Sequence, residues 1–425
     1  MQWLNRAMLR LLIENTSDRE VNTMAEWKMV KLGDIAKTNT STYSPKENWE
    51  FVNYLDTGSI TMNTIDEYQY INTKVEKLPS RARRKVKANS IIYSTVRPNQ
   101  LHYGIIKSTP ANFLVSTGFT VVDVNENEAS PDFIYYALIQ REVTEHLQAI
   151  AEQSVSAYPS IKSSDLEEVE IMLPDLESQK QIVSILGTID GKIKQNVAIN
   201  NNLEQQARAL FKAWFVDFET NSGTMPSTWK IASLSSIARI STEVFSPSKN
   251  PNVDVEVEHY SIPSLDEKHY PVFENSDGIK SNKYRLTHNS VMISKLNPDT
   301  KRIWRPYCIS NTPVCSTEFI VYEPVKASYR DFVYSIIDSE KFSNFLCAHT
   351  TGSTNSRQRV TPSITLNYDI VLPDDEFICM FSSIVSPMYD TIENNIKENQ
   401  LLAETRDKLL PKLMSGELDV SNIDL

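Results

Sequence analysis

A long segment that begins after Pro174 carries apolar residues at a helical spacing. No proline interrupts it before about Phe218. Its apolar positions alternate at intervals of four and three residues, which is typical of the contact line of a coiled coil. We therefore predict one long helix here. Its contact line consists of Ile182, Leu186, Ile189, Ile193, Asn196, Asn200, Leu203, Ala207, Leu210 and Trp214.

The same pattern returns near the end of the chain, where IVLPDDEF at Ile370 repeats IMLPDLES at Ile171. The second contact line also carries two asparagines. Polar residues in an apolar contact line cost stability but fix the register of the pair. We predict that two antiparallel helices bring Asn196 and Asn200 to face Asn395 and Asn399. The alternative is two unrelated amphipathic helices whose asparagines face solvent.

The remaining sequence is also duplicated. WKMVKLGDIA matches WKIASLSSIA, NSIIYSTVRP matches NSVMISKLNP, LVSTGFTVVD matches VCSTEFIVYE, and DFIYYALI matches DFVYSIID, in the same order in both halves. A repeat of about two hundred residues indicates a tandem duplication of one unit and excludes a short-period solenoid.

Each unit mixes two kinds of local pattern. Short β-rich runs such as SIIYSTV and FTVVDV come first, and then Ser130 and Pro131 precede a segment with helical spacing. A serine followed by proline is typical of a helix start. We predict an α/β (α+β) fold: two tandem globular domains and two long antiparallel helices that form a coiled-coil stalk with pseudo-twofold symmetry.

Charge changes this picture. The net charge of −11 argues against a nucleic-acid partner. The distribution argues for one, because nine basic residues and one acid lie between Lys74 and Lys107, and seven basic residues and one acid lie between Lys280 and Arg305. Two basic clusters at matching places in the two repeats therefore indicate two surfaces for an anionic partner.

Motifs of enzymatic and metal sites are missing from the sequence. The four cysteines have no C-x-x-C spacing, and the six histidines form no pair at metal-binding spacing. The sequence contains neither a phosphate-binding G-x-x-x-x-G-K-[ST] loop nor a G-x-G-x-x-G fingerprint. We also find no signal peptide and no run long enough for a membrane span. These features predict a cytoplasmic protein without catalytic or metal-binding residues.

A family resemblance lies in the helical segments. The stretches LPDLESQKQIVSILGTIDGKIKQNVAINNNLEQQARALFKAWFVDF and LLAETRDKLLPKLMSGELDV resemble the conserved regions of the DNA-specificity (S) subunits of type I restriction-modification enzymes. WKMVKLGDIAKT and MPSTWKIASLSSIARI resemble the starts of their two target recognition domains. The corresponding boundaries are an N-terminal extension (1–23), first recognition domain (24–173), central helix (174–219), second recognition domain (220–372) and C-terminal helix (373–425).

The resemblance implies a host-defence protein that reads duplex DNA. One recognition domain would read each half of a bipartite site, and the helices would set the spacer and dock two methyltransferase (M) subunits. ATP-dependent restriction (R) subunits would join this complex. S-adenosylmethionine, ATP and Mg²⁺ are expected on those partners, with no cofactor on this chain. The first 23 residues depart from the family pattern, because the family-like start is at Met24.

Candidate DNA contacts are side chains that neutralise phosphates or read base edges. Any one of them could instead be a solvated surface residue. In the first domain they are Arg81, Arg83, Arg84, Lys85, Arg97, Ser154, Ser156 and Tyr158. In the second domain they are Lys295, Lys301, Arg302, Arg305, Thr354, Asn355, Arg357, Gln358 and Arg359.

The aromatic stripe Phe211, Trp214, Phe215 and Phe218 is wider than a two-helix contact needs. Either the neighbouring recognition domain covers it, or a methyltransferase subunit docks on it. For the whole chain two other functions stay open, which are a coiled-coil adaptor that binds only proteins and a stand-alone nuclease. The duplicated basic clusters favour the specificity subunit over the adaptor, and the missing motifs disfavour the nuclease.

Overall fold

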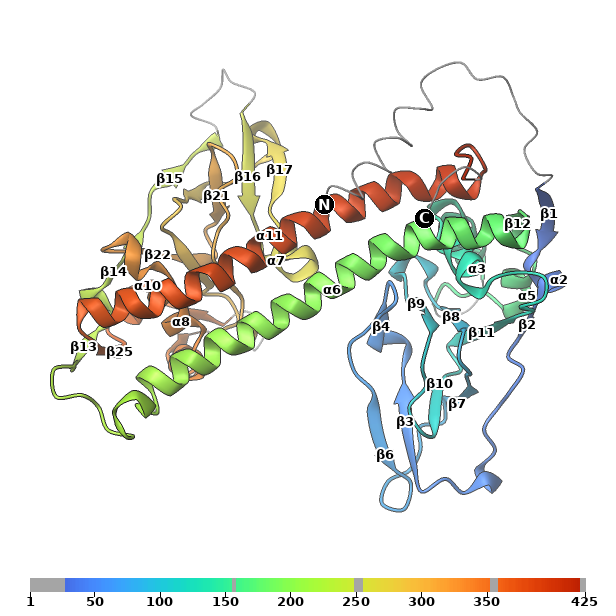
Figure 1. The fold of residues 1–425 in the computed structure, drawn as a ribbon, viewed down its shortest axis with the longest axis horizontal. Helices are drawn as coiled ribbons and strands as arrows, with labels where there is room; N and C mark the ends of the chain where they lie inside the picture. Colours follow the sequence, from blue (N-terminus) through green and yellow to red (C-terminus); the bar gives the residue numbers. More distant parts are fainter. Residues whose placement is uncertain (1–26, 155–157, 248–254, 352–357, 421–425) are drawn as a thin grey trace. The chain divides into compact units, whose positions relative to one another are not determined.

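The computed structural model describes residues 27–154, 158–247, 255–351 and 358–420. The chain divides into two compact units, one comprising residues 1–191 and 403–425 and the other residues 192–402. Two long helices, α6 (Leu176–Phe215) and α11 (Asp375–Met414), contribute residues to both units. These bounds agree with the long helices expected after Pro174 and near the end of the chain. Figure 1 shows both helices and the strands of each unit.

The first unit contains two four-stranded sheets. One has the order β6-β3-β10-β7, and the other has the order β2-β11-β8-β9. The strands of the first sheet are β6 (Gln69–Asn72), β3 (Phe51–Leu55), β10 (Phe113–Ser116) and β7 (Ala82–Lys85). Those of the second are β2 (Ala36–Thr38), β11 (Phe119–Val124), β8 (Ser90–Ser94) and β9 (Tyr103–Ile106).

Two short antiparallel pairs complete the strands of this unit, and four helices accompany them. The pairs are β1 (Lys28–Lys31) with β12 (Glu170–Leu173) and β4 (Ile60–Thr61) with β5 (Thr64–Ile65). The helices are α2 (Leu32–Ile35), α3 (Pro131–Leu138), α4 (Arg141–Glu152) and α5 (Ser163–Glu167). Helix α3 begins at Pro131, as the Ser-Pro signal predicts, because proline at the first helical position needs no hydrogen-bond acceptor.

The second unit contains a four-stranded and a five-stranded sheet, with orders β14-β22-β19-β20 and β15-β18-β21-β16-β17. The first consists of β14 (Ala238–Ser241), β22 (Phe319–Pro324), β19 (Val291–Ser294) and β20 (Ile303–Trp304). The second consists of β15 (Val244–Phe245), β18 (Lys283–Arg285), β21 (Pro313–Ser316), β16 (Glu256–Tyr260) and β17 (Val272–Asn275).

Two strand pairs and four helices belong to the same unit. The pairs are β13 (Lys230–Ser233) with β25 (Asp369–Leu372) and β23 (Thr350–Thr351) with β24 (Arg359–Val360). The helices are α7 (Ile262–Lys268), α8 (Arg330–Asp338), α9 (Glu340–Ala348) and α10 (Pro362–Thr365).

Strand register is the same in the central pairs of the two units. In the first unit β8 pairs antiparallel with β11, and Ser94 lies opposite Phe119. In the second unit β19 pairs antiparallel with β22, and Ser294 lies opposite Phe319. All four strands are almost entirely buried, which explains their near-continuous apolar sequences.

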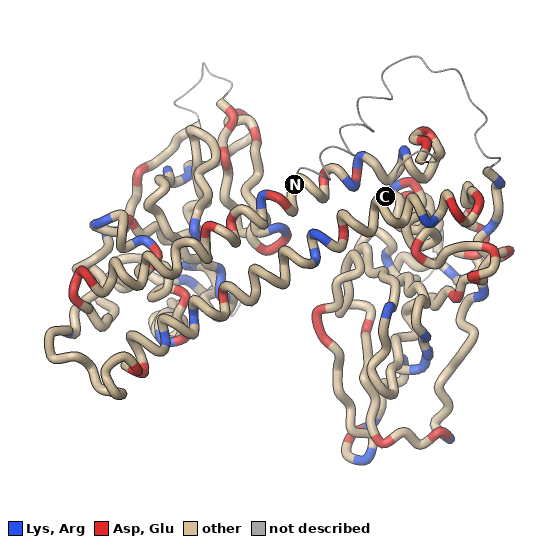
Figure 2. The backbone as a smooth tube through the Cα atoms, in the orientation of Figure 1, with Lys and Arg blue, Asp and Glu red and all other residues tan. Residues whose placement is uncertain are grey.

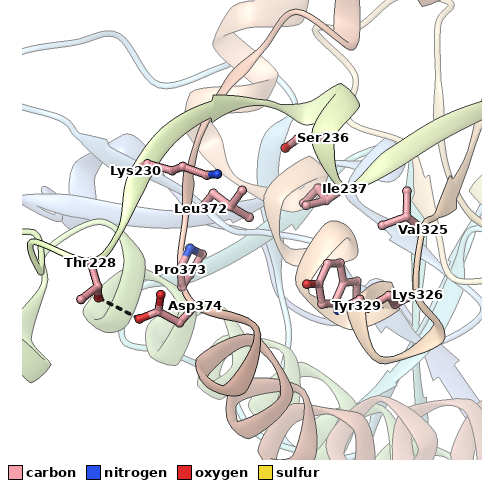
Figure 3. A pocket seen from close by; sticks show the side chains of 10 residues that line it. All are labelled: Thr228, Lys230, Ser236, Ile237, Val325, Lys326, Tyr329, Leu372, Pro373 and Asp374. Atoms are coloured by element: carbon pink, nitrogen blue, oxygen red, sulfur yellow. Dashed lines mark hydrogen bonds between the residues drawn. The ribbon is translucent and has the colours of Figure 1, made fainter.

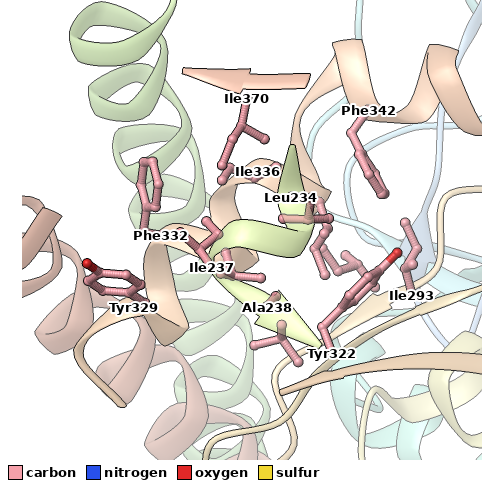
Figure 4. Packing of buried hydrophobic residues seen from close by; sticks show 14 of the residues in the cluster. Leu234, Ile237, Ala238, Ile293, Tyr322, Tyr329, Phe332, Ile336, Phe342 and Ile370 are labelled. Atoms are coloured by element: carbon pink, nitrogen blue, oxygen red, sulfur yellow. The ribbon is translucent and has the colours of Figure 1, made fainter. Parts of the chain in front are cut away.

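A large hydrophobic core lies in the second unit, where β19, β22, α8 and the adjoining parts of α6 and α11 meet. Figure 4 shows Phe332, Ile336, Ile293 and Tyr322 in this core. Phe332 is fully buried. The long helices are therefore packed on the second unit's sheet and are not free-standing there.

Within the second unit the long helices run antiparallel. The Nδ2 of Asn196 donates to the Oδ1 of Asn399 (2.9 Å), and the Nδ2 of Asn395 donates to the Oδ1 of Asn200 (2.8 Å). Asn196 has no exposed surface, and Asn200 is also buried. The structure thus places these four asparagines face to face, in the pairing that the duplicated contact lines predict.

Candidate nucleic-acid interface

Arg97 of the first unit lies in a strained turn between β8 and β9. Its backbone has φ of 49°, in the left-handed region, and it precedes Pro98. Its N–H donates to the carbonyl of Pro159 (2.9 Å), and its guanidinium lies 5.0 Å from the ring centroid of Tyr158. A side chain rarely adopts this backbone conformation without surrounding contacts that impose it. The turn is therefore held from two sides.

Arg81 lies next to the same region. Its carbonyl accepts from the N–H of Thr117 (2.8 Å), and the next residue, Gly118, accepts from the N–H of Thr95 (2.7 Å). Three segments far apart in sequence, at 81, 117–118 and 95–97, are thereby joined. A Cβ on Gly118 would lie 2.8 Å from the Cγ2 of Thr57, so the turn at 117–118 has no room for a larger side chain without a shift.

Strand β7 carries three residues of the first basic cluster, Arg83, Arg84 and Lys85, and Figure 2 shows blue residues along this strand. Arg83 donates through Nε only to the carbonyl of Ser80 (3.4 Å). The Nε of Arg84 is buried without a hydrogen-bond partner, and burial lowers the pKa of this side chain. Lys85 differs, because it pairs with Glu47 (2.5 Å) and lies over the ring of Trp49.

The other candidates of the first domain, Ser154, Ser156 and Tyr158, lie in or next to the segment that precedes α5. The Oγ of Ser154 accepts from the N–H of Ser160 (3.3 Å), which closes the segment before α5. Tyr158 is 59 % exposed and contacts Arg97. Ser156 lies outside the described residues.

Asn297 is the counterpart of Arg97 in the second unit. It also has a left-handed φ (48°) and precedes a proline, and its N–H donates to the carbonyl of Gln358 (2.9 Å). Lys295 corresponds to Thr95, because its N–H donates to the carbonyl of Glu318 (2.9 Å) and its own carbonyl accepts from Val360. Sequence reasoning did not select Asn297, although the match between NSIIYSTVRP and NSVMISKLNP aligns it with Arg97.

Arg305 is not an exposed DNA-contacting residue, and this part of the prediction is wrong. Its guanidinium is 10 % exposed and donates to Asp331 (2.8 Å), Asp390 (2.8 Å) and Glu393 (3.2 Å). Carboxylates from α8 and α11 therefore surround it. Although burial opposes the charged form, these acids raise its pKa. Arg305 therefore links the segment after β20 to α8 and α11.

Lys301 and Arg302 are also ion-paired with acidic side chains. Lys301 pairs with Asp338, and Arg302 donates through Nε to both oxygens of Asp266 (2.7 and 2.9 Å). Arg208 of α6 donates to the same Asp338 (2.6 Å). These partners are distant in sequence, so the local excess of positive charge between Lys280 and Arg305 overestimates the charge available to an external partner.

The remaining candidates are Gln358 and Arg359, at the start of β24, and three residues that precede them in the sequence. Arg359 pairs with Glu318 (3.0 Å), and Gln358 accepts from Asn297 through its backbone. Glu318 corresponds to Gly118 of the first unit, in STEF against STGF. The second unit thus carries an acid where the first has none. Thr354, Asn355 and Arg357 lie outside the described residues.

The aromatic stripe of α6 lies in the core of the second unit. Phe215 is 3 % exposed and packs against Phe332 and Trp229 at ring distances of 4.9 and 5.6 Å. Phe211, Trp214 and Phe218 pack partly buried against the same core. The core of the second unit therefore covers Phe215, which leaves almost none of its surface accessible to a docking partner.

A shallow hollow of about 360 Å³ lies at the start of α11. Figure 3 shows Lys230 and Asp374 among its lining residues, with Thr228 donating to Asp374 (2.7 Å). Lys326 also lines it but pairs with Asp375. The two carboxylates at the start of α11 are therefore each paired with a neighbouring side chain.

The described residues show neither a metal-binding cluster nor a membrane-spanning helix. They contain no group of three or more His, Cys, Asp or Glu side chains placed to hold a metal ion. Among their helices none combines the length and the apolar character that crossing a membrane requires.

The structure thus defines a chain of two mixed α/β units with long paired helices. Residues 24–205 match the family model "Type I restriction modification DNA specificity domain". The chain is 25 % identical to the HindI specificity subunit of Haemophilus influenzae, over 93 % of this chain and 100 % of that protein. It is also 25 % identical to the MjaIX specificity subunit of Methanocaldococcus jannaschii, over 93 % and 94 %. This chain resembles type I restriction enzyme specificity subunits, and the resemblance predicted from its sequence is confirmed.

A solved structure is similar in fold. The crystal structure of a type I restriction-modification system S subunit from M. genitalium has a TM-score of 0.58 and 15 % identity, over 93 % of this chain and 98 % of that one. The mixed helix and strand architecture is shared with that S subunit.

Proposed function

We propose that this chain is the non-catalytic DNA-specificity subunit of a type I restriction-modification system and reads a bipartite duplex site. The recognition domains are residues 24–173 and 220–372, and each reads one half-site. The observation that carries the proposal is the recurrence of one left-handed turn before a proline, at Arg97 and at Asn297. A strained position such as Arg97 is typical of ligand-contacting sites, and Arg and Asn both read base edges with two-point geometry.

We further infer that the helices at 174–219 and 373–425 set the spacer between the half-sites and dock two methyltransferase subunits. A helix of 40 residues spans about 60 Å, and B-DNA repeats an equivalent face about every 34 Å. Such a helix is long enough to bridge more than one turn of DNA. Restriction subunits join this complex. S-adenosylmethionine, ATP and Mg²⁺ bind to the partner subunits, and the complex acts in the cytoplasm.

The test is single-molecule mapping of N6-methyladenine in a methylation-free host that expresses a cognate methyltransferase with or without this chain. A split motif with a fixed unspecified spacer, present only with the chain, is the expected result. The variants Arg97→Ala and Asn297→Ala are matched, and each should relax a different half of the motif. A stable complex without new methylation would favour a protein-binding adaptor.

A further inference from the structure

The two basic clusters differ in how their arginines are compensated. The first contains Arg81, Arg83, Arg84 and Arg97, and none of these four makes an ion pair within the described part of the chain. Arg81 is exposed, and the other three are partly exposed. Guanidinium groups of this kind keep their full charge for an external anion.

The arginines of the second cluster are all ion-paired. Arg285 lies 3.7 Å from Glu243, Arg302 lies 2.7 Å from Asp266, and Arg305 is surrounded by three acids. Lys283 of the same cluster is 7 % exposed and donates to Ser281 (2.7 Å). Acids interleave with bases over this unit in Figure 2.

The turn at Gly118 in the first unit and the equivalent turn at Glu318 in the second also differ in charge. The turn at Gly118 has no side chain, and the nearby Arg81 and Arg97 stay uncompensated. In the second unit Glu318 occupies this position and accepts from Arg359 (3.0 Å). A carboxylate here neutralises the unit's cation and repels phosphate.

We propose that the first unit supplies most of the charge that neutralises DNA phosphates, and that the second unit contacts DNA mainly through uncharged groups such as Asn297. This inference rests on the proposed function. A free cation that binds a phosphate releases counterions, which makes the affinity depend on salt. A cation that is already paired with a carboxylate releases few counterions when it approaches a phosphate. The salt dependence of DNA binding therefore arises mainly in the first unit.

The experiment measures duplex affinity of the full chain in complex with its methyltransferase, from 50 to 300 mM KCl, on a duplex carrying the mapped site. The first variant combines Arg81→Gln, Arg83→Gln, Arg84→Gln and Arg97→Gln. Its matched control combines Arg285→Gln, Lys301→Gln, Arg302→Gln and Arg359→Gln, which remove four ion-paired cations of the second unit. We expect the slope of log Kd against log salt to fall by about three to four in the first variant, at about 0.9 per phosphate contact, and by at most about one in the control.

Further variants separate charge from folding. Replacing the same four arginines of the first unit by lysine should keep the slope, and Arg81→Gln with Arg97→Gln alone should lower it by about two. Glu318→Gln removes the carboxylate that pairs with Arg359 and should therefore raise the slope of log Kd against log salt. Equal losses in both four-residue variants would overturn this inference while leaving the proposed function intact. A wild-type complex that does not bind the duplex would overturn both.

Discussion

The side-chain amide of Asn196 on α6, which has no exposed surface, donates to the amide oxygen of the partly buried Asn399 on α11 at 2.9 Å. The same Nδ2 donates to Glu398 (2.7 Å), which also pairs with Lys192. The Oδ1 of Asn196 is buried without a partner. This pair is thus a polar contact in an apolar line, where a shift of register would leave both amides unpaired.

Replacing one member of this pair should destabilise the second unit. Asn196→Leu leaves the partly buried Asn399 without its donor, at a cost of about 0.5–1.5 kcal/mol in the free energy of unfolding. The double variant Asn196→Leu, Asn399→Leu removes both polar groups and should cost less than the sum of the two single variants. Urea unfolding of the four proteins in a double-mutant cycle measures the coupling. Strictly additive losses would contradict a direct contact.

The sequence predicted the features that depend on local periodicity. The start of α6 after Pro174, the asparagine positions and the buried strands β8 and β19 each follow from spacing within a short window. The positions of the charged partners could not be predicted this way. Arg305 meets acids on α8 and α11 that are tens of residues away, and a local charge count contains no information about such contacts.

Arg305 should act on stability and not on DNA affinity. Arg305→Met leaves the buried carboxylate of Asp331 without its cation, which should cost about 3–5 kcal/mol, whereas Glu393 keeps its pair with Lys397. Arg302→Met is the control, because its partner Asp266 is 43 % exposed and such pairs contribute about 0–1 kcal/mol. Chemical denaturation compares the two. An Arg305 variant with unchanged stability but weakened DNA binding would restore the original assignment.

Phe215 should be a core residue and not a docking residue. Phe215→Ala removes a ring that packs on Phe332 and Trp229, and should lower the free energy of unfolding by about 3–5 kcal/mol. Ile231→Ala serves as the control, because Ile231 is 59 % exposed and its loss should change stability by about 0.5 kcal/mol or less. Loss of methyltransferase binding by Phe215→Ala without loss of stability would show that this face docks a partner.

His269 should make the second unit less stable in mild acid. This residue ends α7 with φ of 50° and packs on Trp304 at 5.3 Å, and burial lowers its pKa to about 4. In the unfolded chain its pKa is about 6.5. Between these values the unfolded state binds the extra proton, so stability is fully present above about pH 6.5 and falls as the pH decreases toward 4.

The loss attributable to His269 should reach about 2 kcal/mol at pH 5. Burial also lowers the pKa of His259, so part of the pH dependence should persist without His269. His269→Asn is the matched variant, because asparagine tolerates the left-handed backbone and does not titrate. Urea unfolding at pH 7 and pH 5 should show a smaller acid loss in this variant than in the wild type. If the two losses were equal, His269 would be solvated in the folded protein, and the acid sensitivity of the second unit would have to come from other groups.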